Sequence, residues 1–318
     1  MDRWRPDADL DALRQRAAVL AGIRSFFAAR GVLEVETPLL CTSGITDPSI
    51  EPLLVERGNS LAAPRYLQTS PEYAMKRLLA AGSGPIFQIA RAFRDDESGR
   101  RHNPEFTLLE WYRPGLDHHA LMDELEQLVG GLLDRQGSKK FSYRDVFREF
   151  AGVDPFLATA AQLEAAAREV TDPGSAHGPR EFWLDMLLTH VIEPALAGLG
   201  LVFVYDYPAA QAALARIAEV DGVAVGQRFE LYVDGVELAN GYNELTDAVE
   251  QRQRFERDNR LRRETGRPER PLDENLLAAL ASGLPDCSGV ALGIDRLVML
   301  ATGSEDIRQV QAFSWDRS

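Results

Sequence analysis

The sequence has 318 residues, is 45% hydrophobic, and carries 35 basic against 49 acidic side chains, for a formal net charge of −14. This length allows one large catalytic domain or two small ones, and the negative charge disfavours non-specific binding to nucleic acid or to an anionic membrane. Only two cysteines occur, Cys41 and Cys287, and they lie far apart without metal-ligand neighbours, which disfavours a disulfide framework and a zinc site. No apolar run is long enough to cross a bilayer, and the N-terminus lacks a signal-peptide pattern, so we expect a cytoplasmic protein that does not interact with membranes.

The chain begins with a predicted helix and a short strand. Apolar residues recur at helical spacing over residues 10–30, and Gly31 follows as a stop. Residues 32–37 read as a strand that ends at Pro38, which cannot donate to a sheet ladder.

A second helix is predicted to begin near Ser70. Ser70 is a good N-cap, Pro71 suits the first helical position, Glu72 suits the first turn, and Gly82 ends the helix. Capping alone explains Ser70 and Pro71, and a solvated charge at the helix end explains Glu72.

A hairpin with a long polar loop follows. Residues 86–93 and 106–112 read as strands, and about eleven mostly polar residues separate them. A loop of this length that contains three arginines, a histidine and four acids is more often functional than a mere connection. Strand parity puts Phe106, Leu108, Glu110 and Tyr112 on one face, and Arg94 at the foot of the loop can bind a phosphate or a carboxylate with its planar fork of donors.

The middle of the chain, residues 139–225, offers no reactive cluster. It predicts helices over 158–170 and 182–197 and a strand over 201–205. The histidines near and within it are interpreted as surface or packing residues: His118, His119, His177 and His190.

A tight hairpin is predicted over residues 228–240, with Asp-Gly as its turn. In that register Tyr232 faces Glu237 and Glu230 faces Ala239, so Glu230 and Glu237 project from one face. Two such carboxylates can share Mg²⁺, although an isolated hairpin more often has simply a solvated polar face.

The last chemical feature lies within residues 288–300. Ala291 and Gly293 share one strand face and leave a floor on which a flat ring could lie. Arg296 falls in the first turn of the next helix, where a cation is unfavourable, so a phosphate partner would explain it.

Three separated motifs resemble those of class II aminoacyl-tRNA synthetases, and their closest resemblance is to the lysine-specific branch. The first helix, strand and Pro38 resemble motif 1, Arg94 with residues 102–106 resembles motif 2, and residues 289–296 resemble motif 3. Residues 69–72 with 76–78, and residues 237–241 with 244–247, resemble the signatures of the lysine branch. The resemblance implies an α+β fold, an antiparallel sheet of six or seven strands flanked by helices, and a homodimer formed through motif 1.

One difference from the tRNA-charging enzymes narrows the resemblance. Only about ten residues precede the motif 1 helix, so we expect a single catalytic domain over residues 1–318 with no anticodon-binding domain. The chain then resembles the paralogues that attach a lysyl group, (R)-β-lysine, to a lysine of elongation factor P, and it carries Ala291 where the tRNA-charging parent has Gly. These paralogues use ATP and (R)-β-lysine or lysine, with elongation factor P as the acceptor and no tRNA.

The resemblance also implies roles for particular residues, with ATP and Mg²⁺ as cofactors. Arg94 and Arg296 are expected to be catalytic. The amino-acid pocket is expected to comprise Ser70, Pro71, Glu72, Glu110, Tyr112, Asn240, Glu244 and Ala291. The ATP site is expected to comprise Arg94, Asp95, Asp96, Arg100, Arg101, His102, Asn103, Phe106, Glu237, Leu238, Gly293 and Arg296. The Mg²⁺ ligands are expected to be Glu230 and Glu237.

Two departures from the family pattern bear on the ATP site. Asp95-Asp96 stands where Asn-Glu is usual, and Arg101 replaces an aromatic residue, so either Arg100 or Arg101 could contact the γ-phosphate. Two other functions remain as alternatives: an enzyme of this type that charges tRNA, and a non-catalytic regulatory paralogue.

Overall fold

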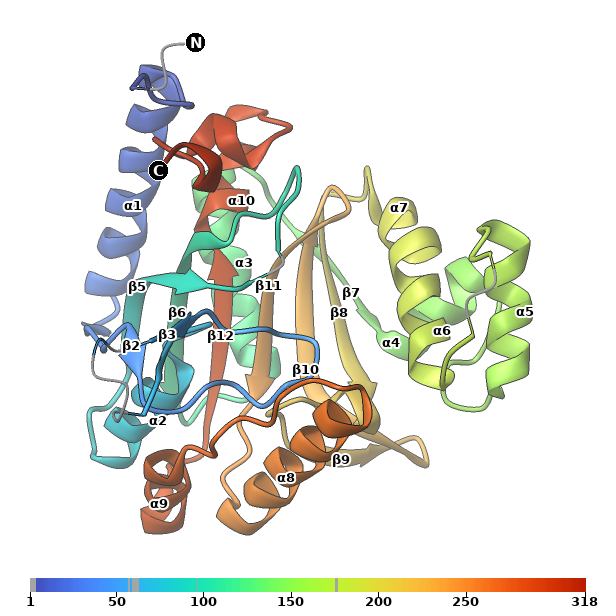
Figure 1. Cartoon of the computed structure of the whole chain (residues 1–318). Coiled ribbons are helices and arrows are strands. Elements are labelled where there is room, and N and C mark those ends of the chain that lie inside the picture. Colours follow the sequence, from blue (N-terminus) through green and yellow to red (C-terminus); the bar gives the residue numbers. More distant parts are fainter. Residues whose placement is uncertain (1–3, 57, 59–62, 96, 175–176) are drawn as a thin grey trace. The chain divides into compact units, whose positions relative to one another are not determined.

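The computed structural model describes the chain except for residues 1–3, 57, 59–62, 96 and 175–176 (Figure 1). By their contacts the residues group into two compact units. The first comprises Met1–Gly115, Thr246–Cys287 and Ala291–Ser318, and the second comprises Leu116–Leu245 and Ser288–Val290. Among the described residues, no helix is long and apolar enough to cross a membrane.

The predicted hairpin is the centre of the first unit. Strands β5 (Ile86–Phe93) and β6 (Glu105–Pro114) pair antiparallel, with Phe93 opposite Glu105 and Ile86 opposite Tyr112. Strand β1 (Leu33–Glu34) adds to β5 in parallel and is shorter than predicted. The β5–β6 pair fits the expected antiparallel sheet, and the β1–β5 pair adds a parallel strand at its edge.

Helix α1 (Leu10–Ala28) begins at the N-cap Asp9 and packs its apolar side against this hairpin. Phe27 is fully buried, stacks on Phe87 at 4.5 Å between ring centroids, and meets Trp111 edge-on at 5.3 Å. Burial of three aromatic rings in one contact fixes the hairpin on the helix. Trp111 therefore lies on the face opposite Glu110 and Tyr112, as strand parity predicts.

The rest of the first unit consists of a small sheet and further helices (Figure 1). A small antiparallel sheet has the order β2 (Leu40–Cys41), β4 (Arg65–Leu67) and β3 (Leu54–Val55). The helices are α2 (Glu72–Ala80), α8 (Ala248–Glu264), α9 (Glu274–Gly283) and α10 (Ile294–Thr302), followed by 3₁₀ turns at Ile307–Val310 and Trp315–Arg317.

The second unit is built on strands in the order β11 (Val236–Asn243), β10 (Val223–Val233), β8 (Leu201–Pro208) and β7 (Ser138–Ser142), with β9 (Ile217–Val220) also paired to β10. The β7–β8 pair is parallel and the others are antiparallel. Its helices are α3 (His118–Leu133), α4 (Tyr143–Val146), α5 (Ala160–Val170), α6 (Arg180–Leu187) and α7 (Glu193–Leu196). Each unit has strands flanked by helices, which confirms the predicted α+β class.

One helix of the second unit differs from expectation. The helix predicted over residues 182–197 is interrupted by a π-helical turn at Leu188–Ile192, and a second π-helical turn, Phe147–Ala151, follows α4. A 3₁₀ turn at Ala209–Gln211 follows β8. Strand β12 (Cys287–Gly293) contributes residues to both units.

Candidate active site

A hydroxyl and a phenol meet a buried carboxylate in the first unit. Glu110 is 2% exposed, and its Oε2 accepts from the Ser70 hydroxyl at 2.6 Å while its Oε1 accepts from the Tyr112 phenol at 2.7 Å. Ser70 lies just before α2, whereas Glu110 and Tyr112 are two residues apart on β6. The structure thus brings together three residues of the predicted amino-acid pocket.

The Ser70 hydroxyl has a different main role from the one its sequence position suggests. Helix α2 begins at Glu72, one residue later than predicted, and Pro71 is the N-cap without a side-chain cap bond. The Ser70 oxygen accepts from the Glu72 amide at 3.1 Å and donates to Glu110. Ser70 therefore links the start of the helix to the buried carboxylate.

Glu72 is balanced by a buried lysine. Its Oε1 lies 2.6 Å from Nζ of Lys76, which is one turn along α2 and 1% exposed. A buried ammonium is costly unless it is paired, so this ion pair explains why both residues face inward. Glu72, a residue of the predicted pocket, therefore already has one cation beside it, and its contact with a substrate stays a prediction.

Arg94 stands at the start of the β5–β6 loop, above an aromatic ring. Its guanidinium carbon lies 5.1 Å from the centroid of the Phe106 ring, and Nη1 lies 3.5 Å from Oε1 of Glu97. Its Nε is buried and, within the part of the chain that the structure describes, has no hydrogen-bond partner. A cation held over a partly exposed ring forms a suitable platform for a planar anionic ligand.

A second arginine approaches the same loop from α10. Nη2 of Arg296 lies 2.6 Å from Nε2 of His102, and its Nε lies 3.4 Å from the carbonyl of Arg101. The pKa of His102 is lowered, first by desolvation and then by the charge of Arg296, with smaller effects of Arg94 and Arg101. The Arg296 guanidinium therefore donates to a ring nitrogen of His102 that carries no proton.

Other predicted ATP residues of the loop have partners within the protein. The Asn103 amide donates to the Glu105 carbonyl at 2.6 Å and accepts from the Trp315 amide at 3.1 Å. Arg100 pairs with Glu305 at 3.1 Å, and both side chains are largely exposed. The Asp95 amide donates to the Glu51 carbonyl at 2.8 Å, and Asp96 lies outside the described residues. Nucleotide contacts by these residues, by Phe106 and by Arg101 stay predictions.

Both carboxylate oxygens of Glu230, in the second unit, accept hydrogen bonds from other side chains. Its Oε2 accepts from the phenols of Tyr207 at 2.6 Å and Tyr232 at 2.5 Å. Its Oε1 lies 2.5 Å from Nη2 of Arg228 and 3.4 Å from the Asn240 amide. The pKa values of both tyrosines are raised well above 10, first by burial and then by the Glu230 charge, so both phenols stay protonated and donate.

These contacts do not fit the prediction that Glu230 binds Mg²⁺. A carboxylate has about four lone-pair directions, and four donors already occupy those of Glu230. Within the described ranges, no group of three or more His, Cys, Asp and Glu residues is arranged to hold a metal ion. Glu230 is instead the centre of a buried polar network.

The β10–β11 register explains the difference. Tyr232 faces Glu237, as predicted, but an irregularity between Leu231 and Tyr232 places Glu230 opposite Asn240 rather than Ala239. The remaining predicted residues of this hairpin are the partly buried Glu237 and the buried Leu238 and Glu244. On β12, Ala291 and Gly293 are both partly buried, on either side of the fully buried Leu292, and their ligand contacts stay predictions.

Comparison with known proteins identifies the family. Residues 2–317 match the family described as tRNA synthetases class II (D, K and N). The chain belongs to this family. It is also 51% identical over 320 residues to proteins named elongation factor P–(R)-β-lysine ligase from Salmonella dublin and Salmonella heidelberg, with 99% of this chain and 98% of each relative covered.

Within this class II chain, several supporting residues were not predicted from the sequence. Asp295, buried in the first turn of α10, accepts from the Thr107 amide at 2.7 Å and from Arg16 of α1 at 2.7 Å. Arg16 is 279 residues from Asp295, so no local pattern could reveal this pair. By contrast, the i,i+4 spacing of Glu72 and Lys76 on a helix was a usable signal.

Proposed function

We propose that this protein is an ATP-dependent ligase that activates (R)-β-lysine, or lysine, as an aminoacyl-adenylate and transfers it to a lysine side chain of elongation factor P. The observation that carries this proposal is the identity of 51% over nearly the whole of both chains to relatives named for that reaction. Membership of the class II synthetase family supports the adenylate-forming step.

The Ser70–Glu110–Tyr112 cluster supports a substrate that carries ammonium groups. Glu110 is a buried carboxylate that accepts hydrogen bonds from the hydroxyls of Ser70 and Tyr112. A buried carboxylate is stabilised by a cation with hydrogen-bond donors, and a lysine-type substrate supplies two ammonium groups. Glu72, with Lys76 beside it, adds a second carboxylate next to the cluster.

The arginines of the β5–β6 loop and α10 support the first chemical step. A carboxylate oxygen of the amino acid attacks the α-phosphorus of ATP, an aminoacyl-adenylate forms, and pyrophosphate leaves. Negative charge grows on the phosphate in the transition state, and positively charged donors such as Arg94 and Arg296 stabilise it if they are already in place. His102 contributes by keeping Arg296 oriented.

In the second step, the unprotonated amine of the acceptor lysine attacks the carbonyl carbon of the adenylate. An amide bond forms, AMP leaves, and the amine loses its extra proton to solvent. Mg²⁺ normally accompanies ATP and neutralises its phosphates; Glu237 stays the predicted protein ligand, while the contacts of Glu230 do not fit this role.

The proposal is tested by the exchange of labelled pyrophosphate into ATP without tRNA. We expect exchange that depends on (R)-β-lysine or lysine, and no charging of lysine tRNA under the same conditions. Efficient tRNA charging would favour the tRNA-charging alternative, and absence of exchange with every amino acid would favour the non-catalytic one.

A further inference from the structure

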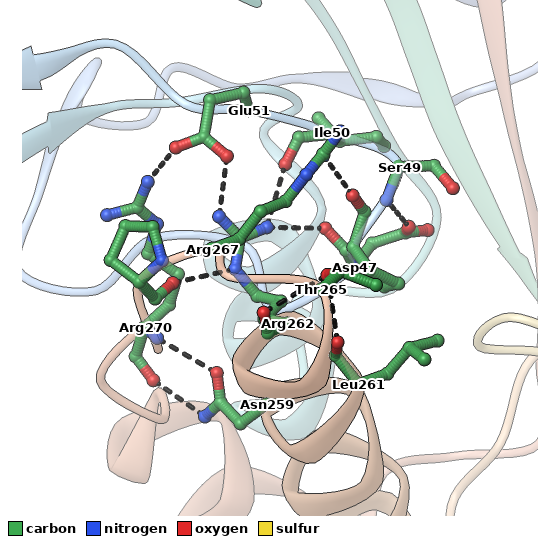
Figure 2. A network of polar contacts seen from close by, with 12 residues as sticks. Asp47, Ser49, Ile50, Glu51, Asn259, Leu261, Arg262, Thr265, Arg267 and Arg270 are labelled. Carbon is green, nitrogen blue, oxygen red and sulfur yellow. Dashed lines mark hydrogen bonds and ion pairs between the residues drawn. The ribbon is translucent and has the colours of Figure 1, made fainter.

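A partly buried carboxylate outside the predicted ATP and amino-acid sites, Glu51, is held by two arginines (Figure 2). Oε2 of Glu51 lies 2.5 Å from Nη2 of Arg262, and Oε1 of Glu51 pairs with Arg270. Arg262, near the end of α8, is fully buried, and only 9% of the Arg270 side chain is exposed. Loss of the Glu51 charge would leave the buried guanidinium of Arg262 without a counter-charge, which is costly.

Backbone contacts extend this network in both directions. Arg262 also donates to the carbonyls of Asp47 at 2.9 Å, Ile50 at 3.3 Å and Pro268 at 2.9 Å. The Asn259 side chain exchanges two hydrogen bonds with the backbone of Arg270, at 2.9 and 2.8 Å. Residues 47–51, the end of α8 and the loop after it are therefore joined as one polar unit (Figure 2).

The same segment is attached at two further points. The Ser43 hydroxyl donates to Asp273 at 2.8 Å, and the Thr46 hydroxyl donates to Asp258 at 3.0 Å. Residues 43–51 are thus bound along α8 and the start of α9, in a part of the chain that the predicted function does not otherwise use.

The segment ends at the loop that carries Arg94. The Glu51 carbonyl accepts from the amide of Asp95 at 2.8 Å, and the amide of Arg94 donates to the Pro104 carbonyl at 2.9 Å. The first two residues of the loop are therefore fixed from opposite sides: Arg94 by the end of the loop, and Asp95 by Glu51.

We propose that Glu51, held by Arg262 and Arg270, is a positioning residue that sets the guanidinium of Arg94 for adenylate formation. This inference rests on the proposed function. A displacement of about 1 Å in the placement of a catalytic group can cost about 10²-fold in rate, and the α8 network supports the Glu51 carbonyl that accepts from the Asp95 amide.

Glu51→Gln tests this inference because it weakens both ion pairs and leaves the backbone carbonyl in place. The matched control is Glu269→Gln, which removes the exposed Arg263–Glu269 pair at 2.7 Å from the same helix end and loop. Two kinds of measurement are made: the hydrogen exchange of peptides that cover residues 93–104, and the kinetics of pyrophosphate exchange, which give kcat and KM.

For Glu51→Gln we expect faster hydrogen exchange confined to residues 43–51 and 93–104, and kcat lowered by about 10- to 100-fold. The KM for (R)-β-lysine should change by less than about twofold, because the Ser70–Glu110–Tyr112 cluster is untouched. The Glu269→Gln control should match the parent in both measurements.

Either of two results overturns the inference. The first is a Glu51→Gln protein with the kcat of the parent. The second is a Glu51→Gln protein in which hydrogen exchange is faster throughout the chain and KM rises while kcat falls. If Glu51→Gln does not fold, Arg270→Lys, which keeps the charge and loses the fork, is judged by the same criteria. If the parent protein has no activity, the proposed function fails. The hydrogen exchange of Glu51→Gln still tests the role of Glu51 in that case: faster exchange confined to residues 43–51 and 93–104 supports it, and faster exchange throughout the chain contradicts it.

Discussion

Arg94 combines three properties in one side chain: a cation over the Phe106 ring, a buried Nε, and a backbone amide fixed to Pro104. A planar guanidinium held in this way can donate two parallel hydrogen bonds to one anion, which a lysine ammonium cannot do. The residue type matters here as much as its charge.

We therefore expect Arg94→Lys to lower kcat for pyrophosphate exchange by about 10²-fold or more, since loss of one preorganised donor typically costs 10²–10³. The control is Arg91→Lys, at a half-exposed arginine three residues earlier on β5, which should keep activity within about twofold. Arg94→Lys with near-parental kcat would remove Arg94 from the mechanism.

The resemblance described above predicts that Ala291 is a position at which this chain departs from the tRNA-charging enzymes. A methyl group in a close-packed pocket typically discriminates substrates by about 10- to 200-fold. We expect Ala291→Gly to move the preference from (R)-β-lysine towards lysine, measured as the ratio of kcat/KM for the two isomers, while the KM for ATP stays near the parental value. An unchanged isomer ratio would make Ala291 a packing residue only.

His102 provides a pH-dependent contact. Its pKa lies below the ordinary 6.5, so as the pH falls below that value the unfolded chain takes up the proton before the folded one. The stability that depends on the neutral ring is present above about pH 6.5 and is lost as the pH falls through the lowered pKa. We expect the free energy of unfolding to fall more between about pH 7.5 and pH 5.5 in the parent than in His102→Gln, as measured by denaturant titration. Equal decreases would show that His102 does not contribute.

At the scale of elements, the two hairpins show what the sequence could predict. The β5–β6 hairpin was predicted with nearly correct strand ends, because strand-like apolar runs enclose a polar loop, and the face shared by Glu110 and Tyr112 is confirmed by their hydrogen bond. In the β10–β11 hairpin the Asp-Gly turn predicted the pairing of Tyr232 with Glu237. The irregularity between Leu231 and Tyr232 has no recognisable pattern in the sequence. It shifts the partner of Glu230 on β11 by one residue, from Ala239 to Asn240.

The Glu230 network is expected to stabilise β10. The pKa of Arg228 is raised, because the charge of Glu230 and its neighbours outweighs the lowering by burial. Glu230→Gln leaves this guanidinium without its counter-charge, and breaking such a pair typically costs about 3–5 kcal/mol in the free energy of unfolding. Denaturant titration measures this loss, which should be the same with and without Mg²⁺.

The control for this experiment is Glu219→Gln, at an exposed position of β9 in the same unit, for which a change within about 0.5 kcal/mol is expected. A loss for Glu230→Gln that appears only when Mg²⁺ is present would restore the original metal-ligand prediction.

At the scale of the whole molecule, the family was predictable because its motifs are separated along the chain and each has a local pattern; the family match over residues 2–317 confirms it. Long-range supports such as Arg16–Asp295 and Glu51–Arg262 were not predictable, because their partners lie more than 200 residues apart. The expectations of a single domain and of a homodimer stay predictions.

The homodimer prediction is supported by leucines exposed around the motif 1 region. Leu33, Leu40 and Leu54 expose 57%, 48% and 49% of their surfaces, respectively, and exposed apolar side chains that gather in one patch mark protein–protein interaction sites. We expect Leu40→Glu to convert a dimer into a monomer in light-scattering measurements. Leu157→Glu, at a leucine that is 68% exposed in the second unit, should stay dimeric. A parent that is monomeric, or a Leu40→Glu protein that stays dimeric, would contradict this prediction.

The central claim is that the acyl group is transferred to a protein rather than to tRNA. The most direct measurement is the intact mass of elongation factor P after incubation with this protein, ATP and (R)-β-lysine, followed by peptide mapping. The account predicts a single added lysyl group on one lysine side chain, and no addition when Arg94→Lys replaces the parent at the same concentration and time. An unmodified elongation factor P, together with lysine tRNA charged by the same preparation, would contradict it.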